Sequence, residues 1–152
     1  MGLPDFRQDG LLPAGIHAAT LQEVQIRFGS GSAIRQRKQE QLVKVVEAAL
    51  AYVTIKRVLL WGSFIPTKAE PNDVDYSLVV AVDHHRADVA EPHRRFLVPF
   101  EARQFYGADT GYLVIRDYPL DLYVERLDFL CQRKRVRCGI VEISLRGEVK
   151  GA

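Results

Sequence analysis

Two aspartates, Asp73 and Asp75, stand two positions apart at the beginning of the apolar stretch 74–82. This stretch is the strongest strand signal in the chain, and because a strand has a period of two, both carboxylates are expected on one face. Two like charges this close repel each other unless a cation compensates them. A divalent ion with oxygen ligands does so, and magnesium suits sites that combine carboxylates with phosphates. The alternative is that the Asp-x-Asp pattern merely ends a loop, with Asp73 as a turn residue.

A Gly-Ser pair, Gly62-Ser63, ends the short apolar run 57–62, which is expected to be a buried strand. Glycine lets a backbone approach a phosphate closely, and the serine hydroxyl and the following N–H groups donate to phosphate oxygens. Taken alone, a Gly-Ser pair is usually only a turn. Lys68, in the loop that follows, is either a positive charge for a phosphate or an ordinary solvated lysine.

The combined arrangement is an apolar strand, Gly-Ser, nine residues, and then Asp-apolar-Asp leading into another apolar strand. It resembles the signature of the DNA polymerase β-like nucleotidyltransferase superfamily. In particular it is similar to the minimal nucleotidyltransferases of toxin–antitoxin pairs, whose Gly-Ser-Phe start is present as Gly62-Ser63-Phe64. The resemblance covers residues 58–82, with a loop one residue shorter than is usual in the minimal branch.

The superfamily also uses a third carboxylate, on a later strand in an apolar-Asp-apolar setting. Leu120-Asp121-Leu122 matches that pattern, and alternation places Asp121 on the face opposite its two leucine neighbours. Asp121 is therefore the expected third carboxylate, with Glu125 as the substitute. An edge-strand aspartate in water would have the same local sequence.

The resemblance implies magnesium-dependent transfer of a nucleoside monophosphate, AMP from ATP or from another nucleoside triphosphate, to a hydroxyl. Three carboxylates would hold two magnesium ions, and the third would act as general base: Asp73, Asp75 and Asp121. The expected nucleotide-binding residues are Gly62, Ser63 and Lys68. The acceptor would be a partner protein, as in toxin–antitoxin systems, or the end of an RNA. Two alternatives are a catalytically silent binding module that sequesters a partner, and a metal-dependent nuclease.

Helices are expected to alternate with strands around these motifs. The capping box 20–23 and the apolar spacing after it predict a helix that ends at Gly29. A second helix follows Ser32, with an apolar set at helical spacing: Leu42, Val45, Val46, Ala49, Leu50 and Val53. Its first part, 35–41, is wholly polar and is expected to project into water or towards an anionic partner.

The rest of the chain predicts a broken helix over 87–106, interrupted by Pro92 and Pro99, and a helix over 125–135. The expected strands, besides those of the motif, are 111–116, 120–124 and 140–145. The fold class is therefore α/β or α+β, and the resemblance specifies it as a nucleotidyltransferase fold, a small mixed sheet with helices packed mainly on one face. We expect one domain over 1–152, divided into N-terminal helices (1–56), catalytic sheet and motif (57–125), and a C-terminal helix and strand (126–152).

The chain has 152 residues and a mass of 17.2 kDa, and its 47% hydrophobic and 26% charged residues are typical of one globular domain. Intrinsic disorder and fibrous repeats are therefore excluded. No apolar run approaches the roughly 20 residues that span a bilayer, and the N-terminus has no apolar signal segment. Cys131 and Cys138 lack the spacing of a redox or zinc motif. A cytoplasmic protein with reduced thiols and no membrane contact is expected.

The net charge of +2 is unevenly distributed, with +5 over 27–57, −5 over 58–125 and +4 over 126–152. An acidic centre between basic flanks is what a metal-and-phosphate site would show, and also what solvated helix faces would show. We assign the flanks to a macromolecular acceptor, contacted by one of two clusters: Arg35, Arg37 and Lys38, or Arg133, Lys134 and Arg135.

Several other side chains are expected to be structural. Trp61 is expected in the core and not as a platform on which a base stacks. His17 follows a Pro-Ala-Gly turn and is expected to make a structural hydrogen bond. No acid or cysteine lies at metal-ligand spacing from the histidines after the second strand, which are expected on the surface or at a helix start: His84, His85 and His93.

Overall fold

The computed structural model describes residues 3–8, 10–29, 31–61, 74–81, 83–106, 110–114 and 139–145. Its elements, in chain order, are β1 (Gly15–Ala19), α1 (Leu21–Phe28), α2 (Ala33–Leu50), β2 (Ile55–Trp61), β3 (Asp75–Val80), the 3-10 helix η2 (Arg86–Asp88), α3 (Glu91–Leu97), α4 (Pro99–Tyr106), β4 (Thr110–Val114) and β5 (Gly139–Ser144). No helix within these ranges is long and apolar enough to cross a bilayer.

The described strands form one sheet in the order β1-β5-β2-β3-β4. β2 runs antiparallel to both of its neighbours, β3 and β5, whereas β1 pairs parallel with β5 and β4 parallel with β3. The sheet is therefore mixed, and with the helices it confirms the predicted α+β class. The predicted strands 120–124 and the predicted helix 125–135 lie outside the described residues.

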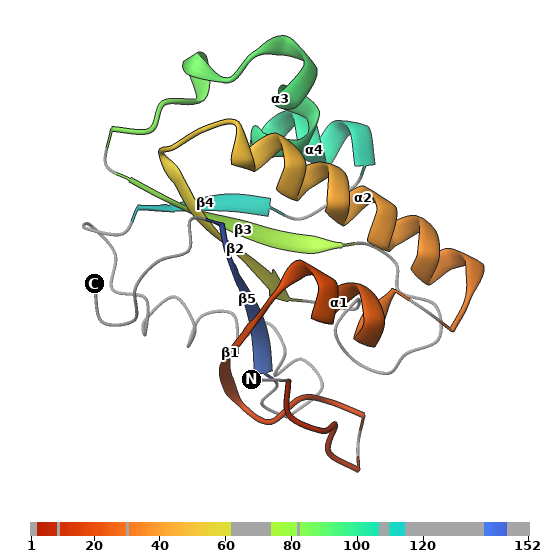
Figure 1. The fold of residues 1–152 in the computed structure, drawn as a ribbon. Helices are drawn as coiled ribbons and strands as arrows, with labels where there is room; N and C mark the ends of the chain where they lie inside the picture. Colours follow the sequence, from red (N-terminus) through yellow and green to blue (C-terminus); the bar gives the residue numbers. More distant parts are fainter. Residues whose placement is uncertain are drawn as a thin grey trace.

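The helices α1 to α4 lie on one side of the sheet (Figure 1). The core between these layers joins alternate residues of the central strands to the inner face of α2. The sheet contributes Val58, Leu60, Tyr76, Leu78, Val80, Val141 and Ile143, and α2 contributes Leu42, Val45, Val46 and Ala49. In addition, the Tyr76 hydroxyl donates a hydrogen bond to the Phe96 carbonyl, which ties β3 to α3.

The predicted helix boundaries are confirmed where a capping residue or a proline defines them. The Thr20 hydroxyl accepts from the Glu23 N–H at 3.1 Å, and the Glu23 carboxylate accepts from the Thr20 N–H at 3.4 Å. Ser32 caps α2 by accepting from the Arg35 N–H at 3.0 Å. The predicted break over 87–106 is confirmed, since α4 starts at Pro99, where proline is tolerated.

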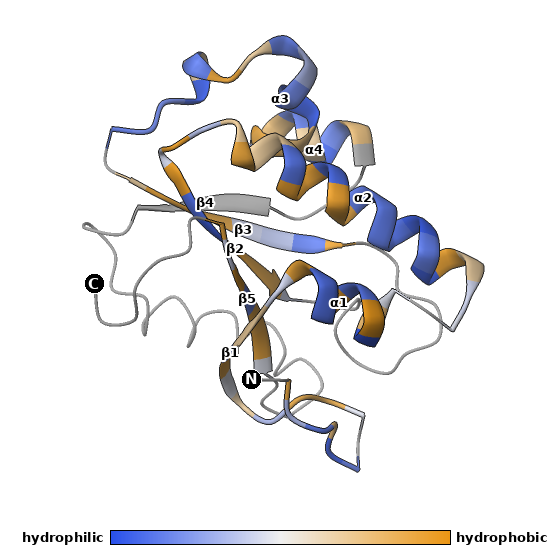
Figure 2. Ribbon diagram, in the orientation of Figure 1, coloured by the Kyte–Doolittle hydropathy of each residue, from blue (hydrophilic) through white to orange (hydrophobic). Residues whose placement is uncertain are grey.

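The second helix differs from its prediction at both ends, although Gln36, Arg37 and Glu40 are exposed as predicted. α2 ends at Leu50, so Val53 lies beyond it and is 72% exposed, and Leu50 itself is 45% exposed. The polar first part of the helix does not simply project into water, although its ribbon is largely hydrophilic in Figure 2, because Arg35 is only 6% and Gln41 only 8% exposed. The Arg35 guanidinium donates to the Phe28 carbonyl at 3.1 Å, and this bond satisfies a carbonyl at the end of α1.

β1 has no counterpart among the predicted elements. It is a short edge strand whose partner, β5, is far away in the sequence, with Gly15 beside Gly139. The two strands approach closely there, since a Cβ on Gly139 would lie 2.2 Å from the Pro13 carbonyl oxygen. A ring nitrogen of His17, Nε2, is hydrogen-bonded to the same carbonyl at 2.6 Å, which confirms the structural role predicted for this histidine.

Candidate functional site

The two halves of the motif meet at one end of the β2–β3 pair. Trp61, the last residue of β2, is the register partner of Asp75, the first residue of β3. The register therefore places the last residue of β2, which precedes Gly62-Ser63 in the sequence, beside the first residue of β3, which is Asp75 itself.

Asp75 lies on the face of the sheet that is turned away from the helices. Its neighbours Val74 and Tyr76 are fully buried, and Tyr76, Leu78 and Val80 belong to the core beneath the helices. Because successive strand residues point to opposite faces, Asp75 shares the second face with Ser77 and Val79. Asp75 itself is half-buried. This confirms the predicted alternation, and we call this second surface the carboxylate face.

Trp61 belongs to the carboxylate face, so the prediction that it lies in the core is wrong. It directly opposes Asp75, and its indole Nε1–H donates to the Ser77 hydroxyl at 3.2 Å. Trp61 is half-buried, whereas Ser77 is only 1% exposed. The run 57–62 is apolar at almost every position, and its pattern therefore did not separate the two faces. Counting alternate residues from the buried Val58 and Leu60 would have placed Trp61 opposite them.

The remainder of the carboxylate face is partly apolar and partly charged. Leu59, Val79 and Ile140 are buried, with exposures of 1% or less. Arg57 and Glu142, on the neighbouring strands β2 and β5, form an ion pair of 3.5 Å. Asp75 lies on β3, opposite Trp61 at the end of β2. The face is therefore half-buried both at Trp61 and Asp75 and at this ion pair.

Among the predicted site residues, only Asp75 is described. Five others lie outside the described residues: Gly62, Ser63, Lys68, Asp73 and Asp121, as does Glu125, the substitute for the third carboxylate. Within the described part of the chain, no group of three or more His, Cys, Asp or Glu side chains is arranged to hold a metal ion. Two of the three predicted carboxylates, Asp73 and Asp121, lie outside this part of the chain.

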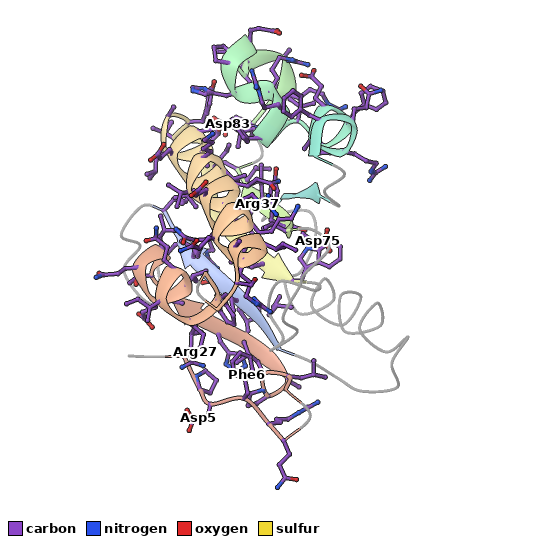
Figure 3. All side chains as sticks on the ribbon, turned by 90° about the vertical axis from the view of Figure 1, so that its right-hand side faces the viewer. Asp5, Phe6, Arg27, Arg37, Asp75 and Asp83 are labelled. Atoms are coloured by element: carbon purple, nitrogen blue, oxygen red, sulfur yellow. The ribbon has the colours of Figure 1, made fainter. Side chains whose placement is uncertain are left out.

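Two histidines, one in the loop between β3 and α3 and one in the first turn of α3, bind the turn between α2 and β2. His84 Nδ1 and the Thr54 hydroxyl are hydrogen-bonded at 2.7 Å, and so are His93 Nδ1 and the Tyr52 hydroxyl. Burial lowers the pKa of the His84 imidazole, an effect that the nearby carboxylate of Asp88 opposes. These contacts lie beyond the C-terminal end of β3, near Asp83, whereas Asp75 stands at its start (Figure 3). His85 is exposed and His93 lies at the start of α3, as predicted, whereas His84 is half-buried in the loop.

The contacts predicted for the first basic cluster are partly excluded. Arg35 is buried against α1 and is unsuited to bind an acceptor, whereas Arg37 is exposed and Lys38 half-buried. The second cluster, 133–135, lies outside the described residues.

No curated protein and no solved structure matches the chain. A family model matches residues 4–144, which is most of the 152 residues and includes every described strand. The chain therefore belongs to DUF6932, a family of unknown function.

Proposed function

We propose that this protein is a magnesium-dependent nucleotidyltransferase that moves a nucleoside monophosphate, AMP from ATP, to a hydroxyl of a protein or RNA acceptor. In this reaction the acceptor oxygen forms a bond to the α-phosphorus. The bond from that phosphorus to the β-phosphate oxygen breaks, and pyrophosphate leaves. The proposal extends to membership of the DNA polymerase β-like superfamily, with a toxin–antitoxin pair as one setting.

One observation carries the proposal: the register of Trp61 with Asp75. This pairing places the end of β2, the strand that precedes Gly62-Ser63, beside the start of β3, the strand that bears Asp75. A phosphate-binding turn and a metal-binding carboxylate must face the same triphosphate, so they need to lie at one end of the sheet. Asp75 is half-buried on the face away from the helices, and this partial access supports the same conclusion, because a nucleotide must reach the carboxylate from solvent.

Magnesium fits the donor chemistry of this end of the sheet. Carboxylate oxygens are the protein ligands it prefers, and Asp75 offers one that is half-buried and so partly accessible. The residues that would hold it are Asp73, Asp75 and Asp121. When bound, it would supply positive charge against the triphosphate and the departing pyrophosphate.

The other motif residues would then act on the nucleotide and on the acceptor. Gly62 and Ser63 would bind the β- and γ-phosphates through backbone N–H groups and the serine hydroxyl. Lys68 would place a positive charge beside the leaving group. Asp121, or Glu125 in its place, would accept the proton of the attacking hydroxyl. A cytoplasmic location, where ATP and reduced thiols are abundant, belongs to the same proposal.

The test is incubation of the purified protein with labelled nucleoside triphosphates, magnesium and cell extract, followed by identification of what becomes labelled. We expect label from ATP to enter one acceptor, and a chelator to abolish it. Asp75→Asn should abolish labelling, whereas Asp83→Asn, an exposed aspartate beyond the other end of β3, should leave it unchanged.

Three results would contradict the proposal in different ways. Acceptor degradation without incorporation of label would indicate a nuclease. A stable complex with a partner, indifferent to nucleotide and to Asp75→Asn, would indicate a silent binding module. Equal loss of labelling in the Asp75 and Asp83 variants would mean that the effect is one of folding, and it would remove Asp75 from the site.

A further inference from the structure

Trp61 is the only tryptophan of the chain, and it is the last residue of β2. It does not contribute to the core beneath the helices, and it stays half-buried on the carboxylate face directly opposite Asp75. Directly opposed residues of an antiparallel pair have Cβ atoms about 4.5–5.5 Å apart. The Trp61 and Asp75 side chains are therefore direct neighbours on the carboxylate face.

The orientation of the indole is held by one hydrogen bond. Its Nε1–H donates to the hydroxyl of Ser77, which is almost fully buried and lies two residues beyond Asp75 on β3. Two strand residues span about 6.6 Å, so the indole reaches from beside the carboxylate towards the middle of the face. Because the N–H lies in the plane of the ring, this bond fixes the edge of the indole and does not itself cover either face of the ring.

We propose that Trp61 is a substrate-binding residue, on whose indole ring the base of the nucleotide stacks while its phosphates lie beside Asp75. This inference rests on the proposed function and adds to it the site for the base. An aromatic ring held at a fixed angle by a buried hydroxyl loses little conformational freedom when a planar group stacks on it. Stacking of a base on an aromatic side chain is favourable for every base, so Trp61 would supply affinity and not base selectivity.

The lone tryptophan makes the first test direct, because all indole emission comes from Trp61. With magnesium present, titration of a non-hydrolysable ATP analogue should change this emission in a saturable manner. Inorganic tripolyphosphate, which has no base, should bind with little change in emission. If both ligands change the emission equally, the indole senses the phosphates or a rearrangement and does not bind the base.

Three variants separate stacking from packing, with affinities measured by calorimetry. Trp61→Phe keeps an aromatic ring and should bind the ATP analogue within about threefold of the wild type. Trp61→Leu keeps apolar bulk without the ring and should bind it about 5- to 150-fold more weakly, the range for one lost stacked base. Phe100→Ala, a side chain that is 63% exposed on α4, is the control and should change nothing.

The outcomes distinguish this inference from the proposed function. If Trp61→Leu weakens tripolyphosphate and the ATP analogue equally, its role is structural and the inference is overturned. If the folded Leu variant binds the analogue as the wild type does, the inference is wrong but the proposed function stands. If the wild type binds neither ligand and transfers no label, both fail together.

Discussion

The two faces of the sheet are formed by the same strands but differ in the side chains that they carry. On the helix side, alternate residues of β2, β3 and β5 are aliphatic or aromatic and fully buried in one core. On the carboxylate face the same strands carry Trp61 and Asp75 at one end, Ser77 and Glu142 in the middle, and Arg57, the ion-pair partner of Glu142, towards the other end. Both faces contain buried residues, and the carboxylate face also carries the half-buried Asp75, Arg57 and Glu142.

The difference shows how a short strand can hold a site without weakening the fold. In β3, Tyr76 and Leu78 pack into the helix-side core, and this packing fixes the position of the backbone that carries Asp75 on the opposite face. A substitution on the helix side should therefore alter stability, and a substitution at the Asp75 end of the carboxylate face should alter activity. The predictions that follow test this separation, from the largest effect to the smallest.

Asp75→Asn should lower the rate of nucleotidyl transfer by about 10³-fold, or roughly 4 kcal/mol, because an amide is a poor substitute for a metal-binding carboxylate. The free energy of unfolding should change by less than about 0.5 kcal/mol, since the side chain is half-buried and similar in shape to that of asparagine. Initial rates with labelled ATP and urea unfolding measure the two quantities. A large loss of stability would break the proposed separation of the two faces.

Leu78→Ala should have the opposite profile. Leu78 is fully buried in the helix-side core, and the cavity left by truncation should lower the free energy of unfolding by about 3 kcal/mol. Below the unfolding transition, nucleotide binding by the folded fraction should be retained. Val53→Ala is the control, because this side chain is 72% exposed and its loss should cost less than about 0.5 kcal/mol.

Gly139→Ala should destabilise the protein by about 2 kcal/mol, within the range for overpacking. The new methyl group would lie 2.2 Å from the Pro13 carbonyl oxygen and 2.8 Å from the His17 ring, so the β1–β5 pair must shift. Thermal unfolding measures the effect, and faster amide exchange confined to β1 and β5 would localise it. An unchanged melting temperature would mean that the edge of the sheet adapts without cost.

Glu142→Gln tests the ion pair on the carboxylate face. It removes the carboxylate that pairs with the half-buried Arg57 at 3.5 Å and should lower the free energy of unfolding by about 1 kcal/mol. The effect should shrink as salt is added, because the charges are partly solvated. Nucleotide affinity should not change, since Glu142 lies on β5, which β2 separates from Asp75 on β3. A loss of affinity would mean that the ion pair and Asp75 act as one site.

The smallest effect concerns the loop beyond β3, where burial lowers the pKa of His84. Unfolded His84 has a pKa near 6.5 and binds a proton more readily than the folded form does. Its contribution to stability is therefore present above about pH 6.5 and is lost as the pH falls through the lower folded pKa. His84→Asn should reduce this slope of unfolding free energy against pH, whereas Asp88→Asn, which removes the carboxylate that opposes the lowering of the His84 pKa, should increase it.

Local signals in the sequence were enough for much of the fold. The alternation over 74–80 placed Asp75 opposite Tyr76 and Leu78, and the structure agrees. The capping box at Thr20 and the proline at position 99 located helix boundaries correctly. In each case the decisive interaction joins residues a few positions apart, so that the chain specifies it without reference to any distant segment.

Only the tertiary structure decided the features that depend on distant partners. Which face Trp61 occupies followed from the burial of Val58 and Leu60 under the helices, because an apolar run such as 57–62 is compatible with burial on either side. The burial of Arg35 depends on a carbonyl at the end of another helix, and β1 exists as a strand only beside β5. The periodicity of a helix or strand depends on neighbouring residues, whereas the pairing of strands and the burial of side chains depend on segments that only the folded chain brings together.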